Sequence, residues 1–498
     1  MTFRISKNSL IFIGIIIIAA IPRAIELING NYLFGFDQGL FYQAVRDIVV
    51  NHHITLIGAP VGGRGGFFQG PGWYYLLAIP FILAHGDPYG GMVLMFILGI
   101  GTVISAYILG SKILDQRAGI IIAVLIAISP TLISQSRFIW PPFPVSFLSV
   151  FFLFFFFKVL QNKKKFLPLV ALSLGLMFHF EAAIGMTLLL QFIIFSPVLF
   201  WKRFISIKSF LSAVLVFVLT QSPLIFFDLR HRFIITKGIL GSFFQGSNSS
   251  HHVTQMYVKV MADNHLGIFL SSFMSIIPFR ILSPYIWILL IVICVFWYVL
   301  MEKDQAKRIF IIYLTTSPIL LFGVFMFYLW PMWEWWILEL PIMYLFLFGI
   351  LIDFLLKKKG FNLLAILLIG FFFSYYLSQT FNYYKNDLHD YGGTAKIKGK
   401  LQVIDYIYKD AGKKPFGVLA FTPPIYTYDT DYLFWWHGQK KYNYSPYHEK
   451  KGIVYLIIEN DPAKPWSSKG WLETVIKTGK VINTKTLSSG YIVQKREF

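Results

Sequence analysis

An acid and several arginines stand in the polar segments between long apolar runs, and these residue types suit chemistry on a phosphate ester. Asp37 lies in the sequence GFDQG, about nine residues after the first apolar run. Arginines follow at four places in similar segments, namely Arg64, Arg137, Arg230 and Arg232. Arginine binds phosphate with bidentate geometry, and a carboxylate can take the proton of an incoming hydroxyl. The combination predicts a site for a lipid-linked anionic headgroup, with Asp37 as the base.

Each of the first three residues also has a simpler interpretation. Asp37 is followed by the amphipathic run QGLFYQAVRDIVV, so it could cap a helix. Arg64 stands in VGGRGGFFQGPG, where the glycines either admit the close approach of a ligand or only make a flexible loop. Arg137 ends an apolar run and could extend toward lipid headgroups.

Three further polar residues could line the same site. Gln69 precedes a short apolar segment and is predicted to bind a phosphate or a hydroxyl, or else to be a solvated loop residue. His179 and Glu181 lie in GLMFHFEAAIG, where they could line a cavity from the membrane side. Alternatively, these two are turn residues satisfied by headgroups or by each other.

The segment FDLRHRF places Asp228, Arg230 and Arg232 at the end of an apolar run. It could hold a phosphate, or form a self-paired cluster that stabilises a turn. Adjacent histidines are poor joint metal ligands on regular structure, and here they occur at 52–53 and 251–252. We therefore expect no cofactor, and the sequence does not support a metal site.

Composition sets the class of protein that carries these residues. The 498 residues are 56% hydrophobic and 14% charged, whereas soluble domains are about a quarter charged. Runs such as LIFIGIIIIAAI are too long and too apolar for soluble core helices. The sequence predicts a polytopic, mainly α-helical membrane protein.

The formal net charge of +20 does not indicate a nucleic-acid partner, because of where the charge lies. Lysines and arginines form short clusters between apolar runs, as in cytoplasmic loops. We expect about eleven membrane spans, with the N-terminus cytoplasmic and the C-terminus extracytoplasmic. The expected spans are 10–28, 90–111, 118–136, 145–160, 166–180, 183–200, 210–227, 281–300, 309–327, 338–356 and 362–381.

The remaining segments complete the predicted organisation. Residues 29–89 form the first external loop, in which 71–84 is an interfacial or re-entrant helix. The pair 166–200 could instead be a single long tilted helix. Residues 1–381 are the membrane domain. Residues 382–498 are expected to form a small extracytoplasmic α/β domain, because the runs FGVLAFT, GIVYLIIE and GYIVQKREF read as strands after a helical stretch GKLQVIDYIYKDAG.

Several short motifs, taken in order, resemble the GT-C superfamily and, within it, glycosyltransferase family 39. This group includes the dolichyl-phosphate-mannose–protein mannosyltransferase-like and aminoarabinose-transferase-like membrane enzymes. The motifs are PR at 22–23, Phe36-Asp37, GPGWYYLLAIPF from 70, GDP at 86–88, SRFIWPP at 136–142 and SPLIFFDLRHRF at 222–233. The resemblance implies that sugar is taken from a polyprenyl-phosphate donor on the external face, with Asp37 as general base. It also implies phosphate contacts at Arg137 and in the region of Gln69.

The expected function is therefore an inverting glycosyltransferase of a prokaryotic cell membrane. Its partners would be a polyprenyl-phosphate sugar and an acceptor glycan, lipid or protein, together with membrane lipid. One alternative is a transporter or flippase of lipid-linked sugars, which would need no base. Another is a non-catalytic membrane assembly protein whose external domain is the working part.

Overall fold

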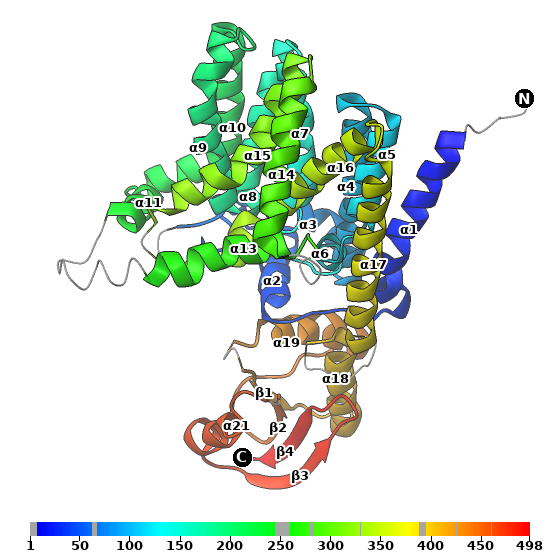
Figure 1. Ribbon diagram of the computed structural model, residues 1–498. Helices are drawn as coiled ribbons and strands as arrows, with labels where there is room; N and C mark the ends of the chain where they lie inside the picture. Colours follow the sequence, from blue (N-terminus) through cyan, green and yellow to red (C-terminus); the bar gives the residue numbers. More distant parts are fainter. Residues whose placement is uncertain are drawn as a thin grey trace, which may run out of the picture.

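The computed structural model describes the chain except for residues 1–6, 62–66, 245–258, 279–282, 329, 388–394, 424–425 and 460. The architecture is mainly helical, with a small sheet near the C-terminus (Figure 1). A bundle of apolar helices occupies one end of the molecule, and the C-terminal domain projects from the other (Figure 1). This confirms the predicted fold class.

Eight of the described helices are long and apolar enough to cross a membrane. They are α1 (Lys7–Asn29), α4 (Tyr89–Ile113), α9 (Ala182–Trp201), α10 (Ile207–Arg230), α14 (Pro284–Met301), α15 (Gln305–Phe325), α16 (Leu340–Leu356) with the turn η4 (Glu334–Ile337) before it, and α17 (Asn362–Asp387). Each corresponds to one of the expected spans.

The other three expected spans hold shorter helices than these eight. They are occupied by α5 (Gln116–Ile128) with α6 (Pro130–Gln135), by α7 (Val145–Leu160), and by η2 (Lys164–Phe166) with α8 (Leu167–Phe180). Pro130 forces Ser129 into an extended conformation, which ends α5. Glu181 is also extended and accepts a hydrogen bond from the Ala183 N–H, so α8 and α9 are two helices rather than one.

The first loop contains two helices, α2 (Phe36–Val50) and α3 (Gly72–Leu83). At 12 residues α3 is about 18 Å long, too short to cross a bilayer core of about 30 Å. Shorter elements follow α10, namely α11 (Ile234–Phe244), η3 (Val260–His265) and α13 (Leu266–Met274).

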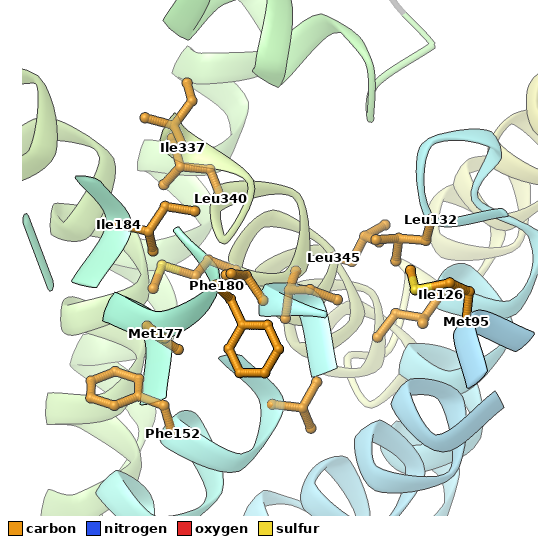
Figure 2. Packing of buried hydrophobic residues seen from close by; sticks show 14 of the residues in the cluster. Met95, Ile126, Leu132, Phe152, Met177, Phe180, Ile184, Ile337, Leu340 and Leu345 are labelled. Atoms are coloured by element: carbon orange, nitrogen blue, oxygen red, sulfur yellow. The ribbon is translucent and has the colours of Figure 1, made fainter. Parts of the chain in front are cut away.

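Helix α16 is the buried centre of the helical bundle. Its residues from Leu340 to Leu355 are all buried, whereas α10, α14 and α17 expose many large apolar side chains. Figure 2 shows Leu340 and Leu345 among the apolar side chains of neighbouring helices, including Phe180 and Ile184. An apolar outer surface around an apolar centre suits a lipid environment.

The C-terminal domain is built on a four-stranded sheet with the order β1-β2-β4-β3. The strands are β1 (Gly417–Phe421), β2 (Ile453–Ile458), β3 (Lys480–Thr486) and β4 (Ile492–Glu497), where β1 and β2 are parallel and the other pairs are antiparallel. The helical elements are α18 (Ile397–Ala411), α19 (Tyr428–Leu433), η5 (Phe434–Gly438), α20 (Gln439–Tyr442), α21 (Ser467–Trp471) and η6 (Leu472–Ile476). The helix and three strands expected from the sequence are present, and β3 was not predicted.

The C-terminal domain is joined to the first loop by backbone hydrogen bonds. The Phe34 N–H donates to the Ala395 carbonyl at 2.7 Å, and the Ile397 N–H donates to the Tyr32 carbonyl at 3.0 Å. Helix α19 packs against α2, which lies between the two parts of the molecule (Figure 1). The Tyr432 hydroxyl also donates to the Gly86 carbonyl at 2.5 Å. The C-terminal domain therefore contacts the first loop near its beginning, along α2 and near its end.

The contact between α2 and α19 depends on Gly39. A Cβ at this position would lie 2.1 Å from the backbone nitrogen of Asp429, so one of the two helices would have to move. We expect Gly39→Ala to destabilise the protein by about 1–3 kcal/mol. Gly14→Ala in α1 is the matched control, because a Cβ there meets nothing within 4 Å. Thermal unfolding in detergent checks the prediction, and equal stability of the two variants would contradict it.

Candidate functional site

Asp37, which the sequence predicts as the base, lies in the first turn of α2. The helix N-cap is Gly35, so Asp37 does not have the capping role that was its alternative interpretation. Gln38 takes part instead, since its Oε1 accepts the Gly35 N–H at 2.8 Å. The Asp37 carboxylate is thus left for another use.

The surroundings of Asp37 leave its carboxylate half-buried. No hydrogen bond or ion pair to this side chain is present within the described ranges. Partial burial raises the pKa of Asp37 above that of an exposed aspartate, because removal from water disfavours the charged form. A half-buried carboxylate without bonded partners is suited to accept a proton.

Two other segments meet at the start of α2. Gln38 Nε2 donates to the Ile139 carbonyl at 2.9 Å, which joins the Asp37 turn to the segment that contains Arg137. From the C-terminal domain, the rings of Tyr426 and Tyr428 lie 5.5 Å and 5.3 Å from the ring of Phe36. Asp37 therefore lies where the membrane helices, the first loop and the C-terminal domain come together.

Arg137 is buried inside the protein, so it does not extend to lipid headgroups. Only 3% of its surface is exposed, and its Nη2 lies 3.0 Å from Oε1 of Glu26. The Lys396 ammonium donates to the same Glu26 oxygen at 3.0 Å. The guanidinium also lies over the rings of Tyr383 and Tyr384, at 4.8 Å and 4.4 Å. A buried network thus connects α1, the Arg137 segment, the end of α17 and the entry to the C-terminal domain.

Gln69, His179 and Glu181 lie close together in the structure. Gln69 is buried, contrary to the solvated alternative, and its Nε2 donates to Glu181 Oε2 at 3.2 Å. His179 Nδ1 accepts the Gly72 N–H at 3.1 Å, and its Nε2 donates to the Thr220 carbonyl at 2.8 Å. These partners fix a neutral ring, and the cluster anchors the second half of the first loop to α8 and α10.

Two glycines of the first loop lie against His179. A Cβ on Gly70 would lie 2.3 Å from His179 Nδ1, and one on Gly72 would lie 2.7 Å from His179 Cβ. Gly70 and Gly72 therefore allow the backbone to approach the histidine. Arg64, in the other part of the same glycine-rich stretch, lies outside the described residues.

The buried carboxyl of Glu181 makes stability depend on pH. Burial raises its pKa to about 8, whereas an unfolded glutamate titrates near 4.3. The folded state therefore keeps its proton where the unfolded state has lost it, and stability falls as pH rises from about 4 to about 8. We expect Glu181→Gln, which stays neutral, to show a smaller loss of thermal stability between pH 5 and pH 8 than the wild type. An equal loss in both proteins would contradict this.

The segment FDLRHRF does not form the self-paired cluster that was one of its two interpretations. Asp228 Oδ1 accepts the Ile235 N–H at 2.7 Å, and Oδ2 accepts the Thr236 hydroxyl at 2.5 Å, so this carboxylate caps α11. Arg230 and Arg232 are exposed, and no ion pair to either occurs in the part of the chain that the structure describes. The rings of Phe68 and Phe227 lie 5.9 Å apart, which places the end of α10 beside the first loop near Gln69.

Some residues of the site were not assigned from the sequence. Glu26 is one of them, and it pairs with both Arg137 and Lys396. Glu339 is fully buried, and neither carboxylate oxygen has a hydrogen-bond partner among the described residues. Both Glu26 and Glu339 lie at the end of an expected membrane span, where an ionisable residue is costly unless it has a function or a partner. This position could have indicated them from the sequence.

Metal-binding geometry is not found in the described ranges, where no three His, Cys, Asp or Glu side chains are grouped closely enough to hold an ion. His53 lies 3.2 Å from Asp47 in an exposed contact, and His251 and His252 lie outside the described residues.

Solved structures share the fold over almost the whole chain. ArnT from Cupriavidus metallidurans bound to undecaprenyl phosphate superimposes with a TM-score of 0.58 and 9% identity, covering 98% of this chain and 97% of ArnT. Its apo state gives a TM-score of 0.57 with the same coverage. The chain has the GT-C fold. The fold implied by the sequence resemblance is therefore confirmed.

A third structure, the oligosaccharyltransferase AglB from Archaeoglobus fulgidus with an inhibitory peptide and a dolichol-phosphate, matches less well. Its TM-score is 0.46 at 14% identity, over 97% of this chain and 74% of AglB. No family model matches the sequence. No curated protein sequence matches it either.

Proposed function

We propose that the protein is an inverting glycosyltransferase that moves a sugar from a polyprenyl-phosphate donor to an acceptor hydroxyl. The observation that carries the proposal is Asp37, a half-buried carboxylate with a raised pKa at the junction of the two domains of a GT-C fold. The crystal structure of ArnT with undecaprenyl phosphate supports the choice of donor class.

In the proposed reaction, the acceptor oxygen attacks the anomeric carbon of the donor sugar. The Asp37 carboxylate takes the hydroxyl proton as the new carbon–oxygen bond forms. The bond between the anomeric carbon and the phosphate oxygen breaks, and the electron pair leaves with the polyprenyl phosphate. Positive charge near that phosphate lowers the barrier to this step.

Arg230 and Arg137 are our first choices for holding the leaving phosphate. Arg230 is exposed at the end of α10, and no carboxylate neutralises it within the described chain. The charge of Arg137 is already balanced by Glu26, so Arg230 has more to offer an incoming phosphate. Arg232 lies two residues further on and can supply a second positive charge.

Gln69, His179 and Glu181 are proposed to shape the donor side of the site. Their hydrogen bonds fix the loop between α2 and α3 against α8 and α10. The loop in turn lies beside the Arg230 segment through the contact of Phe68 with Phe227. A firmly positioned loop reduces the cost of orienting the donor.

Release of polyprenyl phosphate tests this function directly. The purified full chain is incubated with polyprenyl-phosphate sugars and candidate acceptors, and free polyprenyl phosphate is measured by mass spectrometry. The proposal expects release that depends on Asp37. A protein that moves the donor across vesicle membranes without releasing polyprenyl phosphate is instead a transporter, and one that does neither is an assembly protein.

A further inference from the structure

A wide groove lies on the C-terminal domain, between α18 and the hairpin that joins β3 to β4. Its volume is about 840 Å³. One wall comes from α18, and the other wall is formed by the hairpin residues 485–489. The lining positions of α18 recur at the helical spacing of three and four residues, so they occupy one face of the helix: Lys398, Leu401, Gln402, Asp405, Tyr406 and Lys409.

The groove carries uncompensated positive charge. Lys398, Lys409 and Lys485 are exposed, and none of them forms an ion pair in the described chain. Asp405 is the one acid among the lining residues, and it is already occupied. His437 Nε2 and Lys441 Nζ lie 2.8 Å and 2.9 Å from its oxygens, and these partners hold the pKa of Asp405 below its usual value despite partial burial. The groove therefore presents three cations to solvent.

A buried hydroxyl in the same groove also lacks a partner. Gln402 bridges the two walls, since its Nε2 donates to Ser488 Oγ at 2.7 Å and its Oε1 accepts the Ser489 N–H at 3.2 Å. The Ser489 side chain is 4% exposed, and its Oγ has no hydrogen-bond partner among the described residues. A buried hydroxyl without a partner is costly, and Ser489 lines the groove, so a ligand that bonded to this hydroxyl would remove that cost.

The geometry of the charges indicates an extended ligand. Lys398 and Lys409 are eleven positions apart, which corresponds to about 16 Å along a helix. A single phosphate cannot reach both. The Tyr406 ring lies between them along the helix, and the Lys485 ammonium lies over this ring, 5.4 Å from its centroid. Cations at intervals along a polar groove with one aromatic ring fit a chain of sugars that carry acidic groups.

We propose that this groove binds an anionic glycan, one that carries carboxylates or phosphates at several positions. Lipid headgroups also carry phosphates, but the groove is far from the expected position of the membrane. Strand β3 and the far end of α18 lie away from the membrane helices (Figure 1). The proposal does not depend on the transferase activity, and its test measures binding alone.

The test uses the full chain in detergent and fluorescein-labelled polygalacturonate, with neutral dextran of similar length as a second probe. We expect fluorescence anisotropy to show binding of polygalacturonate and much weaker binding of dextran. Replacing Lys398, Lys409 and Lys485 together by Gln is expected to weaken binding by about tenfold or more. Ser489→Ala, which keeps every charge, is expected to weaken it by a smaller factor.

A matched variant controls for net charge. Lys413, Lys451 and Lys464 are also exposed on the C-terminal domain but do not line the groove. Their joint replacement by Gln should leave binding of polygalacturonate nearly unchanged. Equal losses in the two triple variants would overturn the proposal, as would equal binding of dextran and polygalacturonate by the wild type. A third probe is vesicles of phosphatidylglycerol. If the variant that lacks the three groove lysines lost binding to these vesicles but still bound polygalacturonate, the groove would be a site for lipid headgroups, and the proposal would be overturned.

Discussion

Asp37→Asn is expected to lower the rate of polyprenyl phosphate release by about 10²–10⁴-fold, the range that a positioned general base contributes. Asparagine keeps the size of the side chain but cannot accept the proton. The carboxylate forms no hydrogen bond or ion pair within the described ranges, so the variant should remain folded. Its thermal unfolding should match the wild type while its turnover is lost.

Asp47→Asn is the matched control for this prediction. It lies in the same helix, but its carboxylate is exposed and bonded to Asn51 and His53. The same substitution there should leave turnover close to the wild-type value. Full activity in Asp37→Asn would end the assignment of the base.

The pH profile provides a second measurement on the same residue. Asp37 must be ionised to act as a base, and burial raises its pKa. The acid limb of kcat/KM should therefore lie above the usual range of aspartate, with activity falling as pH drops through it. An acid limb at the pKa of an exposed aspartate would contradict the burial of this group.

Arg137→Gln is expected to destabilise the protein by about 3–5 kcal/mol, because removal of one member of a buried ion pair leaves its partner uncompensated. Among the described residues, Glu26 would keep Lys396 as its cationic partner. Cys294 is the single cysteine and is half-buried in α14, so its reaction with a thiol-specific dye reports unfolding. The midpoint of that reaction on heating should drop in the variant.

A double-mutant cycle separates the ion pair from other effects of the substitution. Glu26→Gln combined with Arg137→Gln should cost less than the sum of the two single changes, since each removes the charge that the other would leave unpaired. Strictly additive costs would show that the two side chains do not stabilise each other. Arg137→Lys should restore only part of the stability, because lysine lacks the planar group that lies over Tyr383 and Tyr384.

Much of the architecture follows from patterns within single segments. Long apolar runs predict the spans, and the helical stretch before FGVLAFT predicts α18 within a few residues. Strand β3 was missed because every residue from Lys480 to Thr486 is exposed, so the sequence there carries no alternation between a buried and a solvated face. Its place at the edge of the sheet comes from pairing with β4, which is a contact between segments.

The site was predictable as a set of residue types, and much less so as a set of contacts. Asp37 is the first acid of the loop, and the family resemblance singles it out. Its neighbours Tyr426 and Tyr428, by contrast, are almost 400 positions away, and Glu26 and Lys396 are separated by 370 positions. Asp228 looked equally able to bind an arginine or a phosphate, and its bonds to Ile235 and Thr236 depend on how the chain turns after α10. Spacing in the sequence does not determine such partners.

The pairing of residues 32–34 with residues 395–397 has a consequence for how the protein is made. The first loop leaves the ribosome well before the segment at 395–397 that pairs with it. Until then, Asp37 lies on a loop that lacks its partners from the C-terminal domain. A chain that stops before residue 395 would contain the eight described helices of membrane-spanning length, but it would lack the residues that pair with the first loop.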